Sequence, residues 1–208
     1  MASHPTTTRH FASRAARLIA ASALLAAPHT VEAQSAPLQR NGFEVLFSSG
    51  ALVPTGAQRN ALKDAALSTA QVSYVVRSRF AVTTMVGWAR SRDLASPTDP
   101  KLDVFTFDVG AEARAPRTLG SNAMTLMPFV GAGAGSRSYD YRSLDADATH
   151  NVAAYGAIGG ELGRGRAHVR LEVRDYVTGF RPLAGTGTSA TRNDVVALIG
   201  LRLSKHGS

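Results

Sequence analysis

Charged side chains recur at every second position in the segment Arg166–Phe180, RAHVRLEVRDYVTGF. His168, Arg170, Glu172 and Arg174 alternate there with alanine, valine and leucine. Guanidinium and carboxylate groups this close together can form charge-assisted hydrogen bonds, and a charge that is buried persists only when it is paired. The chemistry that this segment predicts is therefore ion pairing on one face.

Nucleophilic catalysis is not indicated. A lipid-modifying hydrolase would need a Ser–His pair oriented by an acid, and no serine or aspartate partner for His168 is evident in the sequence. The glycine-rich run at 131–135, GAGAG, has a period of two and is followed by SRSYDYR, so it does not resemble a phosphate-binding loop that opens a helix. We expect no enzyme and no cofactor.

Metal binding is only weakly indicated. His150 lies beside Asp145 and Asp147 in LDADATHN, and alternate aspartates next to a histidine could bind a divalent cation. A polar surface loop explains the same residues, and this is the interpretation that we favour. The chain has no cysteine, which excludes disulfides and thiolate metal sites.

The charged face belongs to a β-strand, because successive side chains of a strand point to opposite sides. Seven other segments show strand patterns, and none shows a sustained helical period. They are Gly42–Val53, Gln71–Arg77, Phe80–Arg90, Leu102–Arg114, Met124–Gly135, Val152–Leu162 and Asp194–Leu203. Most of these eight strands are as long as the nine to eleven residues or so that cross a bilayer as a tilted strand.

The predicted connections alternate in length. Those after the first, third, fifth and seventh strands are long, at Pro54–Ala70, Ser91–Lys101, Ser136–Asn151 and Arg181–Asn193. Those after the second, fourth and sixth are shorter, at Ser78–Arg79, Ala115–Ala123 and Gly163–Gly165. Short periplasmic turns and long extracellular loops are typical of an antiparallel up-and-down transmembrane barrel.

The N-terminus has the pattern of a secretory signal peptide. Basic residues precede the apolar run LIAASALLAA, and Val31-Glu32-Ala33 predicts cleavage before Gln34. The predicted organisation is a signal peptide at 1–33, a linker at 34–41, a barrel at 42–204 and a tail at 205–208. The net charge of +8 falls when the three arginines and one glutamate of the signal are removed. A basic exported chain without Lys/Arg tracts fits anionic headgroups better than nucleic acid.

From Gly42 to Leu203 the chain resembles the small eight-stranded outer-membrane β-barrel family, which includes the transmembrane domain of outer-membrane protein A. The resemblance rests on the signal peptide, the strand pattern, the alternating connections and the segment PFVGAGAG at 128–135. It implies an all-β, eight-stranded antiparallel up-and-down transmembrane β-barrel in a Gram-negative-type outer membrane. The C-terminal LRLSKHGS departs from the aromatic residue on which family members usually end.

If the apolar face of each strand contacts lipid, the opposite face collects charges of both signs in the lumen. These residues are Glu44, Arg77, Asp108, Glu112, Arg114, Glu161, Arg170, Glu172, Arg174 and Arg202. The balance predicts an ion-pair network, with the glycines at 131, 133, 159 and 200 leaving room for long arginine side chains. A filled eight-stranded barrel is an anchor or plug rather than an open pore.

Aromatic residues are expected at the two membrane interfaces, where Phe43, Phe80, Trp88 and Phe105 are candidates near strand ends. Tyr139, Tyr141 and Arg137 are expected above the membrane, either as a headgroup-level rim or as a recognition surface.

The predicted role is structural, or the presentation of long loops to an extracellular partner. The expected surroundings are the lipid bilayer and headgroups of the lipopolysaccharide type, with no nucleic acid. Two alternatives remain open: a narrow channel for a small solute, and a soluble secreted barrel that holds an apolar ligand.

Overall fold

A computed structural model describes residues 41–76, 79–120, 124–142, 144, 147–180 and 190–205. The predicted signal peptide at 1–33, Arg77, and nearly all of the predicted linker and tail lie outside these residues. The barrel belongs to a compact unit that spans Pro37–Ser208.

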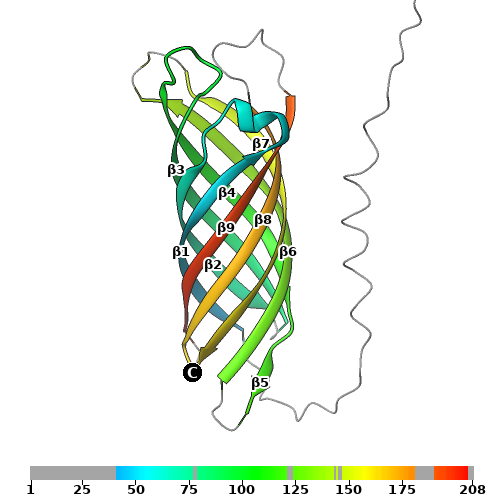
Figure 1. The fold of residues 1–208 in the computed structure, drawn as a ribbon. Helices are drawn as coiled ribbons and strands as arrows, with labels where there is room; N and C mark the ends of the chain where they lie inside the picture. The colour runs from blue at the N-terminus through cyan, green and yellow to red at the C-terminus, as the bar shows by residue number, and fades with distance from the viewer. Residues whose placement is uncertain are drawn as a thin grey trace, which may run out of the picture. The chain divides into compact units, whose positions relative to one another are not determined.

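The described residues form nine strands and one short 3₁₀ helix (Figure 1). The elements are β1 (Gly42–Thr55), η1 (Gly56–Asn60), β2 (Ala65–Val76), β3 (Phe80–Arg92), β4 (Lys101–Arg114), β5 (Arg117–Leu119), β6 (Met124–Tyr141), β7 (Thr149–Arg164), β8 (Ala167–Phe180) and β9 (Ala190–Lys205). No helix in this part of the chain is long and apolar enough to span a membrane.

All strand pairs are antiparallel, and eight of the strands close into a barrel. The order of the sheet is β4-β3-β2-β1-β9-β8-β7-β6-β5, and an additional pairing of β4 with β6 closes the ring. The short β5 pairs only with the beginning of β6, so it lies outside the ring and lengthens the connection between β4 and β6. The predicted eight-stranded up-and-down barrel is confirmed.

The alternating sequence explains why these segments pair as a closed sheet. In β3 every second residue is buried from Ala81 to Ser91, and those between are exposed. Large apolar side chains populate the outer surface, among them Phe47, Val152 and Ile158, which are 60%, 81% and 64% exposed. A closed sheet has no unpaired edge, and its apolar outer surface suits hydrocarbon.

Four strands extend at least three residues beyond the bounds that the alternation indicates. β2 begins at Ala65 instead of Gln71, β6 continues to Tyr141, β7 begins at Thr149, and β9 begins at Ala190. Apart from Leu67, the early positions of β2 carry Ala, Ser and Thr, whose small side chains give little contrast between the two faces. The barrel wall therefore extends into segments that were expected to be long loops.

The two ends of the barrel differ. The end of β9 and the short β5 lie at one end, and η1 lies at the other (Figure 1). At the first end a two-residue turn, Gly165–Arg166, joins β7 to β8, and Gly165 has φ of +62°, a backbone conformation that favours glycine. Short turns face the periplasm in outer-membrane barrels, so under the predicted membrane orientation η1 marks the extracellular end, the name that we use for this end of the barrel.

Candidate functional site

The charged face of β8 points into the barrel. Arg170, Glu172 and Arg174 are 1%, 3% and 1% exposed, whereas Val169 and Leu171, which alternate with them, are half or more exposed. Successive side chains of a strand point to opposite faces of the sheet. When the sheet closes into a barrel, the even-numbered side chains of β8 therefore all lie on the inner side. The candidate site is therefore the lumen itself.

Arg170 is the most connected of these charges. Its guanidinium donates to Glu112 Oε1 at 2.6 Å, to Glu161 Oε1 at 2.7 Å and to Glu172 Oε2 at 2.8 Å. These carboxylates come from β4, β7 and β8, so one side chain joins three strands across the lumen.

Two more arginines complete a closed ring of alternating charge. Arg114 lies 2.6 Å from Glu44 and 2.8 Å from Glu112, and Arg202 lies 2.6 Å from Glu44 and 2.7 Å from Glu161. We call this set the ionic ring: Glu44, Arg114, Glu112, Arg170, Glu161 and Arg202. Each carboxylate contacts two arginines, and each arginine contacts at least two carboxylates. Because the ring contains three glutamates and three arginines, it carries no net charge.

A second group of contacts continues from the ring toward the extracellular end. Glu172 accepts from both Arg170 and Arg174, and Arg174 also donates to Gln71 Oε1 at 2.8 Å. Arg174 lies 3.5 Å from Asp108, which accepts a hydrogen bond from the Tyr176 hydroxyl. All nine described members of the predicted set of lumen residues are thus brought together inside the barrel.

Aromatic rings support the guanidinium groups. The Cζ atom of Arg170 lies 3.6 Å from the ring centre of Phe129, and that of Arg174 lies 4.7 Å from the ring centre of Tyr155. A guanidinium above an aromatic face is attracted by the ring quadrupole. These contacts add to the ion pairs that hold the two arginines in place.

Two of the four lumen glycines, Gly133 and Gly159, make room for these rings rather than for the arginines that the sequence led us to expect there. A Cβ placed on Gly159 would lie 2.4 Å from Cζ of Phe129, and one placed on Gly133 would lie 2.6 Å from Cε1 of Tyr155. At Gly131 and Gly200 the nearest side-chain atoms belong to Glu112 and Ser48.

The expected recognition residues at the end of β6 also lie inside. Arg137 and Tyr139 are fully buried, and Tyr141 is 4% exposed, so the three do not form an outward recognition surface. Arg137 donates to Asp194 Oδ2 at 2.7 Å and lies over the ring of Tyr176. The signal that could have located them is the period of two, which continues without a break from Phe129 to Tyr141.

Toward the extracellular end an apolar cluster, which sequence reasoning missed, occupies the lumen together with the buried Arg137–Asp194 ion pair. Leu62, after η1, packs there with residues from several strands. The members of the cluster are Leu52, Ala61, Leu62, Ala65, Leu67, Ala89, Leu102, Val104, Tyr139, Tyr141, Ala153, Tyr155, Tyr176, Val196 and Leu198.

Among the described residues, one serine contacts a histidine and no metal-ligating cluster is found. Ser138 Oγ and His150 Nδ1 are 2.7 Å apart on the exposed rim, and no described carboxylate contacts His150. Asp145 lies outside the described residues, and those that are described contain no group of three or more metal-ligating side chains. The chemistry that the lumen supports is charge pairing.

Comparison with known proteins identifies the fold. No family profile and no curated protein matches the sequence. Among solved structures, the Neisserial surface protein A has a TM-score of 0.59 at 10% identity, over 79% of this chain and 99% of its own. The outer-membrane protein AlkL, determined in DMPC bilayers, has a TM-score of 0.51 at 15% identity, over 88% and 98%.

The closed ring of eight strands, its apolar outer surface and these likenesses agree with one another. The chain has the fold of the small eight-stranded outer-membrane β-barrels.

Proposed function

We propose that the protein is a closed outer-membrane barrel with a structural or surface-interaction role, and that it does not conduct solutes. The observation that carries this proposal is the ionic ring, whose six residues are each at most 5% exposed. Water or a solute would have to separate buried ion pairs in order to pass, and an unpaired buried charge is strongly unfavourable.

The apolar cluster supports the same proposal from the extracellular half. Leu52 and Val196 are fully buried on the inner side, and Leu62 is 1% exposed, so apolar side chains occupy the lumen beyond the ring. An eight-stranded barrel is narrow enough for side chains alone to fill it.

The alternative of a soluble barrel with an apolar ligand requires charged side chains outside and apolar ones inside. The described residues have the reverse pattern over most of the wall, with Arg170 and Glu172 inside and Phe43 and Leu171 outside. Phe43, Phe80, Trp88 and Phe105 are all more than a third exposed, which suits the predicted aromatic contacts with the membrane interfaces.

We assign the protein no catalytic role. Its proposed surroundings are the bilayer and, on the extracellular side, headgroups of the lipopolysaccharide type, with the loops available to an extracellular partner. Export of the chain with cleavage before Gln34 is part of the proposal, and N-terminal sequencing of the mature protein tests it.

Planar bilayer recording tests whether the barrel is closed. The folded protein is first identified by a change in gel mobility on boiling and is then reconstituted, with protein-free bilayers as the control. We expect no stable conductance steps above this control. Large, long-lived steps would favour the narrow channel instead.

A further inference from the structure

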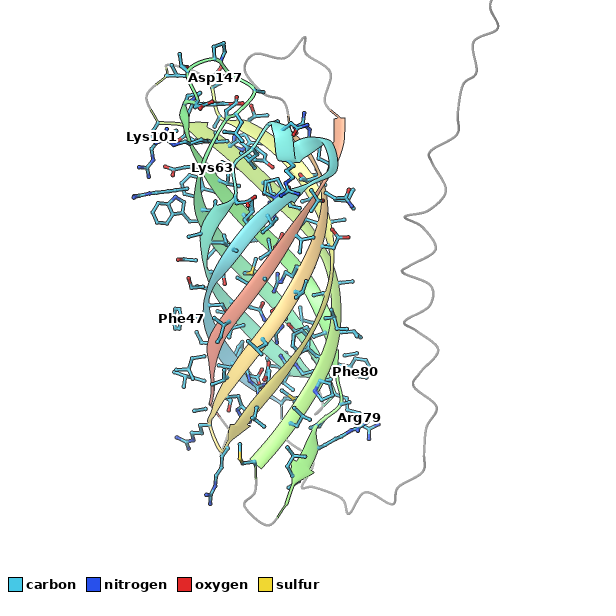
Figure 2. The ribbon with its side chains drawn as sticks, in the orientation of Figure 1. Phe47, Lys63, Arg79, Phe80, Lys101 and Asp147 are labelled. Carbon is cyan, nitrogen blue, oxygen red and sulfur yellow. The ribbon has the colours of Figure 1, made fainter. Side chains whose placement is uncertain are left out.

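A basic pocket of about 360 Å³ opens at the extracellular end of the barrel wall, where β2, β3 and β4 meet. Its lining includes five cationic side chains, Lys63, Arg90, Arg92, Lys101 and Arg142, and one acidic side chain, Asp64. Figure 2 places Lys63 and Lys101 at this end of the barrel, and Arg79 and Phe80 toward the other.

Most of this positive charge is not neutralised within the described part of the chain. Arg142 donates to Asp103 Oδ2 at 2.6 Å. Lys63, Arg90, Arg92 and Lys101 are exposed and form no ion pair with a described carboxylate. The pocket is therefore a concave surface of net positive charge.

Hydrogen bonds hold the walls of the pocket in place. The Lys63 N–H donates to the Arg92 carbonyl at 3.1 Å, and the Ser91 hydroxyl donates to the Lys63 carbonyl at 2.5 Å. On the other wall, the Arg142 N–H donates to the Lys101 carbonyl at 3.2 Å. The cationic side chains thus project from backbone that is fixed by the fold, which reduces the entropy lost on binding.

The strand register gives the height of the pocket relative to the membrane. Trp88 is paired with Phe105 across β3 and β4, and both are exposed on the outer surface. Arg92 is paired with Lys101 four residues farther along β3, and Arg90 lies between, with its Cζ 4.4 Å from the ring centre of Trp88. Trp88 lies four residues before the end of β3, where interface aromatics of a barrel are found, so in the proposed orientation these cations lie at headgroup level.

We propose that this pocket binds the phosphate groups of a phosphorylated, acylated saccharide lipid of the lipid A type in the outer leaflet. Guanidinium and ammonium groups are the protein groups that bind phosphate most strongly. The acyl chains of the lipid lie against the apolar outer surface below Trp88, where Val86 is half exposed. This inference rests on the proposed membrane barrel and its orientation.

The single tryptophan of the chain is the natural probe, because Trp88 lies beside Arg90 at the pocket. The folded protein in phosphatidylcholine nanodiscs is titrated with bisphosphorylated lipid A, with fully dephosphorylated lipid A and with inorganic pyrophosphate. We expect a saturable change in Trp88 fluorescence with bisphosphorylated lipid A only.

The variant that tests the pocket is Lys63→Gln/Arg92→Gln/Lys101→Gln, which leaves Arg90 in place beside the probe. We expect it to bind bisphosphorylated lipid A roughly 100-fold more weakly, because each cation near an anionic lipid surface strengthens binding several-fold. The matched control is Arg79→Gln/Arg164→Gln/Arg166→Gln, which removes three exposed charges at the opposite end. We expect the control to bind like the unmodified protein.

Three outcomes would overturn the proposal. Equal weakening in both variants would mean a general attraction to anionic lipid, and equal binding of dephosphorylated lipid A would exclude phosphate recognition. Saturation by pyrophosphate at the same concentration would assign the pocket to free phosphate. Gel mobility and bilayer recording of the same samples test the closed barrel separately, so the two proposals can fail independently.

Discussion

The two halves of the lumen are filled in different ways. The half near the short turns holds the ionic ring, which begins with Glu44 near the start of β1. The half near η1 holds the apolar cluster, which includes Leu52 near the end of the same strand, and beside it one buried ion pair, Arg137–Asp194. One strand therefore contributes a charge to one half and an aliphatic side chain to the other, while its outer face remains suited to lipid.

The difference shows that two kinds of interaction can close the same cross-section. The stability that the ring provides requires every member, because each charge contacts two ring members of opposite charge. The loss of one member leaves its buried partners with fewer opposite charges. The cluster depends on volume, because its members contribute through the area that they bury and the space that they fill. Substitutions in the two halves should therefore differ in size and in how they combine.

The largest effect is expected in the ring. Arg170→Ala should lower the free energy of unfolding by roughly 3–5 kcal/mol, because Glu112, Glu161 and Glu172 each lose a partner. Urea titration in lipid vesicles, followed by gel mobility, measures the change. Adding Glu112→Gln to the same chain should recover part of the loss, and a loss below about 1 kcal/mol for Arg170→Ala alone would contradict a cooperative ring.

The apolar half should respond less strongly. Leu52→Ala should cost about 3 kcal/mol, since Leu52 is fully buried and the substitution leaves a cavity. Combined with Arg170→Ala, the two costs should add to within about 0.5 kcal/mol, because the two residues belong to different halves of the lumen and have no common ion-pair partner. A large departure from additivity in the same urea titration would show that the halves form one network.

A smaller effect is expected where an aromatic ring fills a gap in the wall. Gly159→Ala should cost roughly 1–3 kcal/mol, because its Cβ would meet the ring of Phe129 and the carbonyl of Leu171. Gly160→Ala is the matched control, since a Cβ there meets no atom within 4 Å. Equal urea midpoints for the two variants would show that the absence of a side chain at Gly159 is not needed for packing against Phe129.

The smallest effect is expected for an ion pair outside the lumen. The side chain of Arg142 is 33% exposed where it contacts Asp103, so Arg142→Gln should change the free energy of unfolding by less than about 1 kcal/mol. Unfolding at low and high salt measures this contribution. A cost equal to that of Arg170→Ala would show that burial is not what makes the ring important.

The number of strands and their inner faces could be predicted from sequence because alternation is local. Arg170, Glu172 and Arg174 identify their own face by spacing alone, and the strong contrast with Val169 and Leu171 leaves one assignment. The contrast is lost where both faces carry small residues, as at the start of β2, and there the predicted boundary was wrong.

The choice of partners could not be predicted, because it depends on how the strands are staggered around the barrel. Arg114 meets Glu44 from a strand 70 residues away, and nothing near either residue in sequence indicates the other. The placement of Arg137 failed for a different reason. Two tyrosines beside an arginine suggested a rim or a recognition surface. The period of two along β6 instead indicated correctly that Arg137, Tyr139 and Tyr141 lie on the inner side.

The pairing of β1 with β9 has a consequence for the order of events during assembly. Glu44 and Arg202, which meet across this seam, are separated by 158 residues, and Phe43 is in register with Lys205. Until β9 has been synthesised, β1 and β8 each keep an open edge that hydrocarbon cannot satisfy. The seam therefore closes only once the last strand is in place, and its large sequence separation makes its formation a slow step of folding.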